Sequence, residues 1–395
     1  MMKELDSCYV VASKLGSIGM GSTAKAAAEG ISKSSLNYKI FCRGYESNIK
    51  INTKNLTNYS FLEYLSYPFR FLEKKVGLKV DSFKLVNWIF GKLVKINLPK
   101  TKIYHTWMGV APEALKKARK NRAILILEGA NSHPNNTFDI LEKEYIRYEL
   151  QEYISDLNNL KTAAGLIKKF DYVLCPSDFV YESFLKNGFK ENQLFKIPYG
   201  VDLKKFTIER KKHKKITYIF IGSIQVRKGI YYLLESWKSL NLKDAELILV
   251  GRVWPDAKNI VKKYMNEPNI KFVGFDSHPS KYLRESDVFI SPSMEEGSAL
   301  TCYEAMASGL PIIATFNTGA VARDKKEGFI IPAGDMDKLK SKIKYFYDNP
   351  KQIIKMGNAA RKRVEDFSWE NYGKKVLETY SKILKNENRN SSFYK

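Results

Sequence analysis

Short apolar runs alternate with amphipathic stretches along most of the chain. In the first half, runs typical of buried strands occupy 8–12, 38–42, 102–104, 123–127, 172–175 and 194–197. Stretches with apolar residues at helical spacing are found at 23–31, 111–120, 139–157 and 177–186. Strands that alternate with helices in this way predict a parallel sheet covered by helices.

A second series with the same alternation begins after 198–200 and a charged cluster at 210–215. Its strands are expected at 216–221, 245–250, 270–273, 288–291, 311–314 and 329–331. A chain of 395 residues is long enough for two domains. The predicted fold class is therefore α/β, with two Rossmann-like domains whose parallel sheets face a cleft between them, where open sheets of this kind bind ligands.

We place the domain boundary at 199/200, with an N-terminal domain at 1–199 and a C-terminal domain at 200–367. A last helix is expected at 368–385, because Ser368 is a suitable N-cap and Phe367 and Tyr372 are placed for a hydrophobic staple. The polar remainder, 386–395, is expected to fray.

Charge is the most unusual feature of the composition. Lys and Arg number 66 against 42 Asp and Glu, so the formal net charge is +24. This excess favours an anionic partner, such as nucleic acid, an anionic membrane or a phosphorylated small molecule, although a general bias toward lysine would give the same value. With 44% hydrophobic residues the disordered and collagen-like classes are excluded.

The cysteines and the apolar runs indicate a cellular compartment. The four cysteines are far apart in the sequence, which argues against a disulfide framework or a structural zinc site. Acidic residues precede the first apolar run, and no run is long enough to span a membrane. We expect a cytoplasmic protein, with peripheral contact to the membrane left open.

The stretch 291–311 carries the most specific chemistry. A loop of small residues separates a predicted strand from a helix expected to begin at about Leu300, with Glu296 in the loop and Glu304 on the helix. Free N–H groups and the dipole at a helix N-terminus attract phosphate, and carboxylates accept hydrogen bonds from sugar hydroxyls. The alternative is that both glutamates are ordinary surface residues.

This stretch resembles the signature of the retaining glycosyltransferases of family 4, the glycosyl transferases group 1, which have the GT-B fold. The family pattern is P-S-x-x-E-G and then E-A-M-A-x-G-x-P, with seven residues between the two glutamates, and it is met from Pro292 to Pro311. The resemblance implies that Glu296 contacts the donor sugar and that Glu304 holds the ribose hydroxyls. It also assigns to the donor site Gly297, Ser298, Ala299 and Leu300. Ser298 and Ala299 replace the Phe-Gly that the family often has, and their N–H groups are still expected to be donors.

A second segment, 222–229, resembles the family's G-R-L-x-x-x-K-G. The resemblance places Lys228 at the donor pyrophosphate, as a point charge suited to phosphate. Ser223 stands where the family has an arginine. Arg227 either supplies the missing charge or is exposed to solvent.

The first half offers weaker candidates. Gly19 and Gly21 follow the first strand, and in the resembled fold this loop faces the donor phosphates and the acceptor. The family commonly has a histidine near the donor sugar at the position of His133, whereas His105 ends the preceding strand. The alternative for both histidines is a hydrogen-bonded structural role.

Two further features bear on metals and membranes. Asp335 begins a formal D-x-D, but its position before a predicted helix makes it a natural N-cap, so no metal requirement is expected.

The segment 61–102 has nine basic residues, three acidic residues and eight aromatics. Its apolar stripe is formed by Val76, Val80, Phe83, Val86, Phe90 and Leu93. This stripe lies either on an anionic leaflet or in the core.

The resemblance therefore implies a retaining, metal-independent glycosyltransferase without a cofactor, which moves a sugar from a UDP- or GDP-linked donor to a hydroxyl of a glycan or lipid-linked acceptor. Envelope polysaccharide or glycolipid synthesis is the expected setting, with Glu296, Lys228 and His133 as the catalytic candidates. The alternatives are a nucleotide-sugar epimerase or phosphorylase of the same fold, a glycoside hydrolase, and a basic protein that binds nucleic acid or membranes. Nucleic acid is not expected, because no reader motif is present.

Overall fold

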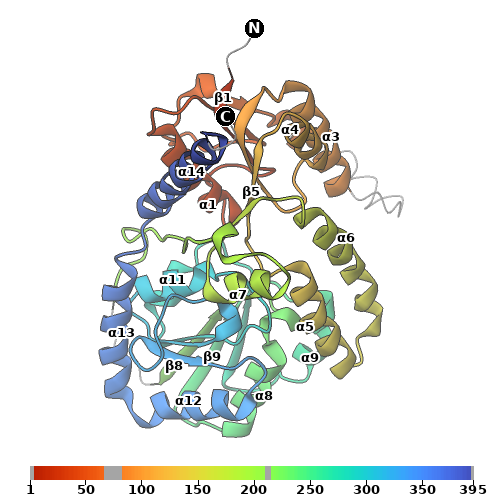
Figure 1. The fold of residues 1–395 in the computed structure, drawn as a ribbon. Coiled ribbons are helices and arrows are strands. Elements are labelled where there is room, and N and C mark those ends of the chain that lie inside the picture. The colour runs from red at the N-terminus through yellow and green to blue at the C-terminus, as the bar shows by residue number, and fades with distance from the viewer. Residues whose placement is uncertain (1–3, 66–81, 210–214, 393–395) are drawn as a thin grey trace.

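The computed structural model describes residues 4–65, 82–209 and 215–392. Figure 1 shows two bodies, each built around a sheet with helices packed on it. The first sheet has seven strands in the order β3-β2-β1-β4-β5-β6-β7, and the second has six in the order β10-β9-β8-β11-β12-β13. Every strand pair is parallel, as the alternation of strands and helices predicted.

The first sheet is formed by the first half of the chain. Its strands are β1 (Leu5–Val10), β2 (Tyr38–Cys42), β3 (Leu56–Asn58), β4 (Thr101–Trp107), β5 (Ile124–Glu128), β6 (Tyr172–Cys175) and β7 (Leu194–Lys196). Its helices are α1 (Met20–Ser32), α3 (Ser82–Asn97), α4 (Pro112–Lys120), α5 (Pro134–Arg147), α6 (Asn158–Ile167) and α7 (Asp178–Lys186). The short edge strand β3 was not predicted, because three residues are too few for a periodic signal.

The second sheet follows the predicted series closely. Its strands are β8 (Ile216–Ile221), β9 (Ala245–Val250), β10 (Ile270–Gly274), β11 (Val288–Ser291), β12 (Ile312–Thr315) and β13 (Gly328–Ile331). The helices are α8 (Ile230–Leu240), α9 (Lys258–Lys262), α10 (Ser280–Arg284), α11 (Leu300–Ala307), α12 (Met336–Asp348), α13 (Pro350–Val364) and α14 (Trp369–Ser392). The central strands are continuous apolar runs because helices cover both faces of the sheet, and such runs are easily recognised.

The single helix expected at 139–157 is wrong. Helix α5 begins earlier, with Pro134 in its first turn and His133 as N-cap, and it ends at Arg147. Glu149 has left-handed backbone with φ of 56°, which stops the helix, and a 3₁₀ segment, η2 (Gln151–Leu157), follows. The apolar periodicity continues across this break, so the pattern alone did not reveal it.

The segment from α5 to η2 crosses from one body to the other. It connects strands of the first sheet, but Leu141, Tyr145 and Leu157 pack in the same apolar cluster as Tyr218 and Leu233 of the second body. In Figure 1, α5 accordingly lies beside the lower body, near α9. A boundary drawn at 199/200 by sequence therefore does not describe how the two cores are assembled.

Helix α14 returns to the first body and lies along α1 (Figure 1). The two helices approach closely at Gly30 and Gly373, where a Cβ on Gly30 would overlap the backbone of Gly373. Helix α14 continues to Ser392, beyond the range 368–385 expected from the sequence. Neither proline nor glycine follows Lys385, so nothing in the sequence stops the helix there.

The apolar stripe of α3 belongs to the core. Val86, Phe90 and Val94 are buried in one cluster with Leu62 and Tyr104. This decides between the two interpretations of the stripe: its described residues pack on the sheet and do not face a membrane. Val76 and Val80, and the side chain of Phe83, lie outside the described residues.

Candidate functional site

A cleft of about 1280 Å³ lies between the two bodies, at the carboxyl ends of strands from both sheets. The loop after β1 and helix α1 line one side, and the loops after β8, β9 and β11 line the other together with α11. The predicted site residues that line the cleft are Gly19, Ser223, Lys228, Glu296, Ser298, Ala299, Leu300 and Glu304. Residues far apart in the sequence thus meet where open parallel sheets bind ligands.

The N-terminus of α11 points free N–H groups at the cleft. Leu300 and Thr301 line the cleft, and within the described chain no acceptor is present for their N–H groups. Ala299 differs from the prediction, because its N–H donates to the carbonyl oxygen of Thr318 at 3.1 Å. The N–H groups of Leu300 and Thr301 are therefore the donors available to an anion in place of Ala299, and the helix dipole adds to their attraction.

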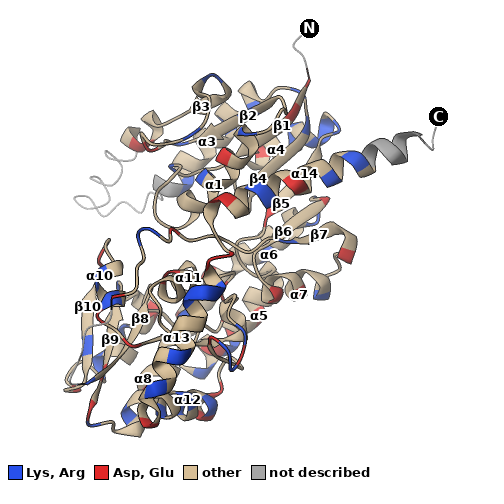
Figure 2. Ribbon diagram, turned by 90° about the vertical axis from the view of Figure 1, so that its left-hand side faces the viewer, with Lys and Arg blue, Asp and Glu red and all other residues tan. Residues whose placement is uncertain are grey.

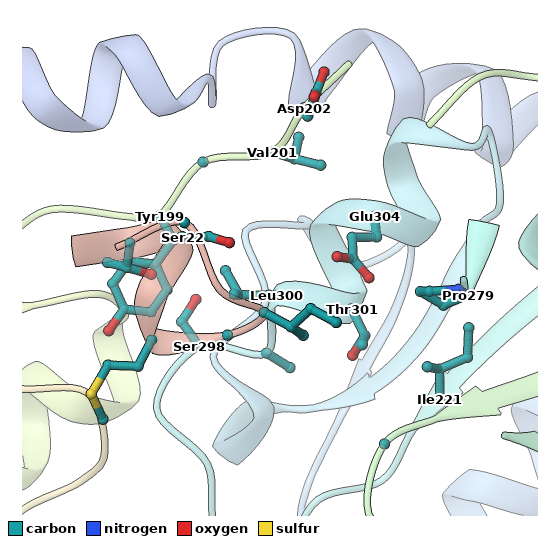
Figure 3. A pocket seen from close by; sticks show the side chains of 18 of the residues that line it. Ser22, Tyr199, Val201, Asp202, Ile221, Pro279, Ser298, Leu300, Thr301 and Glu304 are labelled. Carbon is teal, nitrogen blue, oxygen red and sulfur yellow. The ribbon is translucent and has the colours of Figure 1, made fainter. Parts of the chain in front are cut away.

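Glu304 extends from α11 into the same part of the cleft. Figure 3 shows its carboxylate beside Thr301, in the space bounded by Ile221 and Pro279. Burial raises the pKa of Glu304 to about 7, although the charge of Lys205 opposes this shift. Among the described residues no hydrogen-bond partner occupies this carboxylate, so its oxygens can accept hydrogen bonds from a ligand.

Lys228 and Glu296 form a close ion pair at the floor of the cleft. Lys228 ends the turn η4 (Val226–Lys228), which follows β8, and Glu296 lies in the loop after β11. Burial, followed by the positive charge of Arg227, lowers the pKa of Lys228 to about 7, while Glu295 opposes the shift. The pair presents a cation and a carboxylate to the same small volume.

Arg227 lies beside this pair but does not line the cleft. Its Nε donates to Glu295 Oε2 at 2.5 Å, and its Nη2 donates to Asn131 Oδ1 at 3.1 Å. The guanidinium is partly buried, and its hydrogen bonds go to Glu295 and Asn131 within the protein. It joins the two bodies.

The chain is similar to known proteins in sequence and in fold. Residues 202–363 match the family model Glycosyl transferases group 1. This group 1 region contains the turn η4, the loop after β11 and α11, and so carries Lys228, Glu296 and Glu304. The match bears out the coarser part of the resemblance, a glycosyl transferases group 1 domain.

Curated relatives are similar over part of the chain. An MMP alpha-(1->4)-mannosyltransferase of Mycolicibacterium hassiacum is 31% identical over 49% of this chain and 49% of its own length. The capsular polysaccharide biosynthesis glycosyltransferase CapM of Staphylococcus aureus is 26% identical over 54% of this chain and 62% of its own length. The chain therefore spans only about half to three fifths of these relatives.

Solved structures match almost the whole chain. Sucrose-phosphate synthase from Thermosynechococcus elongatus aligns with a TM-score of 0.67 at 17% identity, and covers 96% of this chain and 100% of its own. Anabaena HepE in complex with UDP aligns with a TM-score of 0.65 at 14% identity, over 96% and 100%. The fold of this protein is GT-B.

Glu295 is the important residue that the sequence did not single out. It precedes Glu296 directly, has no solvent-exposed surface and accepts hydrogen bonds from Ser132 N–H at 3.2 Å and Ser132 Oγ at 2.9 Å. Burial alone would raise its pKa, but Arg227 and the Ser132 hydrogen bonds together hold the pKa below its usual value. The only sequence signal was a second glutamate in the loop, whose burial no periodicity reveals.

Two of the predicted glycines have packing roles instead of lining the cleft. A Cβ on Gly297 would overlap the carbonyl oxygen of Ala130 in the first body, and Ser177 Oγ donates to Gly297 O at 2.5 Å. A Cβ on Gly21 would overlap the side chain of Ser17 and the backbone carbonyl oxygen of Lys14. Gly19 does line the cleft, and its φ of 78° at the N-cap of α1 favours glycine.

Polar side chains of the group 1 region fix other parts of the cleft wall. Ser298 Oγ hydrogen-bonds to Tyr303 Oη at 2.9 Å and to Gly319 O at 2.9 Å. Ser223 Oγ accepts from Gln225 Nε2 at 2.6 Å. Both hydroxyls thus form hydrogen bonds within the protein. Serine at these two positions adds no positive charge to the cleft wall, and its side chain is held in place by these hydrogen bonds.

Neither candidate histidine lines the cleft. His133 is buried as the N-cap of α5, where its Nδ1 accepts from Asn135 N–H at 3.3 Å and its ring meets Phe184 edge-on. Burial, with a smaller effect of Lys168, lowers the pKa of His133 to about 4, so the ring is neutral near pH 7. His105 is fully buried against Tyr380 of α14. Both side chains take the structural role that the sequence had left open.

Asp335 caps α12, as its sequence position predicted. Its side chain accepts from Lys338 N–H at 2.9 Å. Within the described ranges, no group of three or more His, Cys, Asp or Glu side chains is arranged to hold a metal ion. No helix of the described chain has both the length and the apolar character needed to cross a membrane.

Proposed function

We propose that the protein is a retaining, metal-independent glycosyltransferase that uses a nucleoside-diphosphate sugar and a glycan or lipid-linked acceptor. One observation carries the proposal: Lys228, Glu296, Glu304 and the free N–H groups of α11 converge on one cleft between two open sheets. The group 1 match over 202–363 and the glycosyltransferase relatives support it. A cation and two carboxylates suit a ligand that joins a diphosphate to a ribose and a sugar.

In this proposal the donor lies along the C-terminal side of the cleft. The diphosphate faces Lys228 and the N–H groups of Leu300 and Thr301, while Glu304 accepts hydrogen bonds from the ribose hydroxyls. Glu296 holds the sugar. HepE, a protein of the same fold, forms a complex with UDP, and this supports UDP as one donor nucleotide, with GDP as the other candidate.

The chemical step is then a transfer between two oxygens on the same face of the sugar. The bond from the anomeric carbon to the diphosphate oxygen breaks, the acceptor hydroxyl oxygen bonds to that carbon, and the hydroxyl proton passes to the departing diphosphate oxygen. Negative charge grows on the departing diphosphate, where Lys228, two N–H groups and the helix dipole stabilise it. No residue is assigned as a covalent nucleophile, and His133 takes no part because it does not line the cleft.

A thermal-shift panel of nucleotides and nucleotide sugars, with and without EDTA, tests the proposal, because a ligand that binds the native state raises the melting temperature. We expect UDP or GDP and one of its sugars to stabilise the protein, with EDTA making no difference. Stabilisation that EDTA abolishes would contradict metal independence. The absence of any shift would overturn the donor site.

Retention is tested with the stabilising nucleotide sugar as donor. The anomeric configuration of the sugar that is first released to water, or transferred to a model alcohol, is followed by proton NMR. The same configuration as in the donor is expected, and the opposite configuration would contradict the retaining mechanism. Release of sugar from a glycoside without any nucleotide would favour the hydrolase alternative instead.

We further propose that the protein contacts an anionic membrane through the outer face of α3, opposite the buried stripe. On this face Trp88 is 59% exposed and Ile96 72% exposed, and Lys92 Nζ lies 5.5 Å from the centre of the Trp88 ring. Lys84 and Lys92 are one turn from Trp88 on either side along the helix. An exposed aromatic flanked by lysines suits the interface of an anionic leaflet.

The positive charge is not confined to this helix, however. Figure 2 shows Lys and Arg on α8, α12, α13 and α14 as well as around the first sheet. Sedimentation with phosphatidylglycerol vesicles, compared with phosphatidylcholine vesicles, measures the contact. Trp88→Ala should weaken binding to the anionic vesicles, whereas Ile354→Ala, which removes an exposed apolar side chain from α13, should not. Equal binding by both variants would remove α3 from the proposal.

A further inference from the structure

A buried carboxylate lies behind the proposed donor site. Glu295 is adjacent to Glu296 in the loop after β11, yet only Glu296 lines the cleft. Glu295 has no exposed surface and points toward the first body, where Ser132 donates to it from both N–H and Oγ. A carboxylate removed from water in this way must be compensated by partners, and here the compensating charge is Arg227.

Two carboxylates, those of Glu295 and Glu296, lie close to the guanidinium of Arg227. Its Nε binds Glu295 at 2.5 Å, while its Nη2 lies 3.8 Å from Glu296 Oε1. The backbone holds it in this position, since the Arg227 carbonyl oxygen accepts from the N–H groups of Met294 and Glu295 at 2.9 and 3.3 Å. The next residue is Lys228, whose partner is Glu296. A small movement of the guanidinium would therefore make it compete with Lys228 for Glu296.

We infer that Glu295 is a positioning residue for the proposed transfer: it holds Arg227 away from Glu296, so that Glu296 and Lys228 remain available to the donor. Because it also accepts from Ser132, Glu295 ties this arrangement to the first body, and Arg227 adds the contact with Asn131. These contacts between the two bodies then orient the charged side chains on the donor side of the cleft. This inference rests on the proposed function.

A positioning role of Glu295 differs from a purely structural role in one measurable way. If Glu295 only stabilises the fold, its removal lowers the free energy of unfolding but leaves the kcat of the folded enzyme unchanged. If Glu295 restrains Arg227, a variant without Glu295 suffers from the released guanidinium, and loss of that guanidinium restores activity. The kcat of the folded enzyme, compared with the free energy of unfolding of the same variants, therefore separates the two roles.

The experiment compares Glu295→Gln, Arg227→Gln and the double variant in the full-length chain. Affinity for UDP and GDP is measured by calorimetry, and turnover as release of UDP or GDP from the nucleotide sugar that stabilises the wild type. We expect Glu295→Gln to lower kcat about tenfold or more with a smaller change in KM, and the double variant to recover part of that loss. The matched control is Glu327→Gln, which removes a buried carboxylate that pairs with Arg323 at 2.5 Å outside the cleft.

Each outcome has a definite meaning. Wild-type kcat in Glu295→Gln, or a double variant no better than the single one, overturns the inference while leaving the proposed function intact. An equal loss of kcat in Glu327→Gln also overturns it, since general destabilisation would then explain the effect. A wild-type protein that binds neither UDP nor GDP overturns the proposed function, and the inference with it.

Discussion

Two adjacent glutamates show how strongly the surroundings decide what a residue does. Glu296 faces the cleft and pairs with Lys228, whereas Glu295 is buried against Arg227 and Ser132. Their side chains are chemically identical, and neighbouring backbone positions send them in opposite directions. At the residue scale the site is therefore a set of paired charges, in which Lys228 lines the cleft and Arg227 does not.

The pKa of Lys228 leads to a prediction about pH. Since burial lowers this pKa to about 7, a growing fraction of Lys228 is neutral as pH rises above 7, and a neutral amine attracts a diphosphate less. We expect the affinity of the wild type for UDP or GDP to fall between pH 7 and pH 9. In Lys228→Met, affinity should be about tenfold weaker or more at pH 7, with little dependence on pH over this range.

Calorimetric titration at several pH values provides the measurement. Lys338→Met, which removes an exposed lysine from α12, is the matched control and should behave like the wild type. Equal affinity of Lys228→Met and wild type at pH 7 would remove Lys228 from the phosphate site. An affinity of the wild type that stays constant to pH 9 would contradict the lowered pKa.

At the scale of elements, glycines set the closest approaches. Helices α1 and α14 touch at Gly30 and Gly373, and the loop after β11 touches the first body at Gly297. In each case a single Cβ would overlap backbone, which cannot move as a side-chain tip can. The Gly297 contact lies in the same loop as Glu295 and Glu296, which form the residue-scale pairs above.

Gly30→Ala should therefore destabilise the protein, although alanine is the better helix former. The added methyl group overlaps Gly373 O, and we expect a loss of about 2 kcal/mol in the free energy of unfolding. Gly165→Ala in α6 is the control: no atom lies near its Cβ position, so we expect a gain of about 0.5–1 kcal/mol. Denaturant unfolding of both variants gives the comparison. If Gly30→Ala instead raised the free energy of unfolding, helices α1 and α14 would have to move apart at little cost to accommodate the methyl group.

At the scale of the whole molecule, the two sheets do not correspond to two independent cores. The segment from α5 to η2 belongs to the first sheet by connection and to the second body by packing. Tyr145 Oη also lies 3.5 Å from Asp256 Oδ2, whose carboxylate accepts from the N–H of Val226 at the start of η4. The crossover between β5 and β6 thus supports the turn that carries Lys228.

This packing predicts that the two bodies unfold together. Leu141 is 5% exposed within the shared cluster, and Leu141→Ala should cost about 2–5 kcal/mol. Differential scanning calorimetry should show one transition that moves to lower temperature as a whole. Ile146→Ala, on the exposed side of the same helix at 55% exposure, should leave it nearly unchanged. Two separate transitions, with only one shifted, would show that the bodies unfold independently.

Much of this architecture could be predicted from local pattern. The strands of the second sheet begin and end within one residue of the predicted ranges, because continuous apolar runs bounded by turns are a local signal. The helix break at Glu149, the continuation of α14 and the edge strand β3 were missed, since each depends on a single backbone conformation or on a neighbouring segment.

The sequence by itself determined the two parallel sheets and singled out Lys228, Glu296 and Glu304, which line one cleft, because strand periodicity and motif spacing are properties of consecutive residues. Only the tertiary structure decided that Ala299 N–H is occupied, that His133 caps a helix away from the cleft, and that Glu295 holds Arg227. The partners that settle these roles, such as Thr318 and Ser132, come from distant parts of the chain. Burial and charge pairing exist only once folding has brought them together.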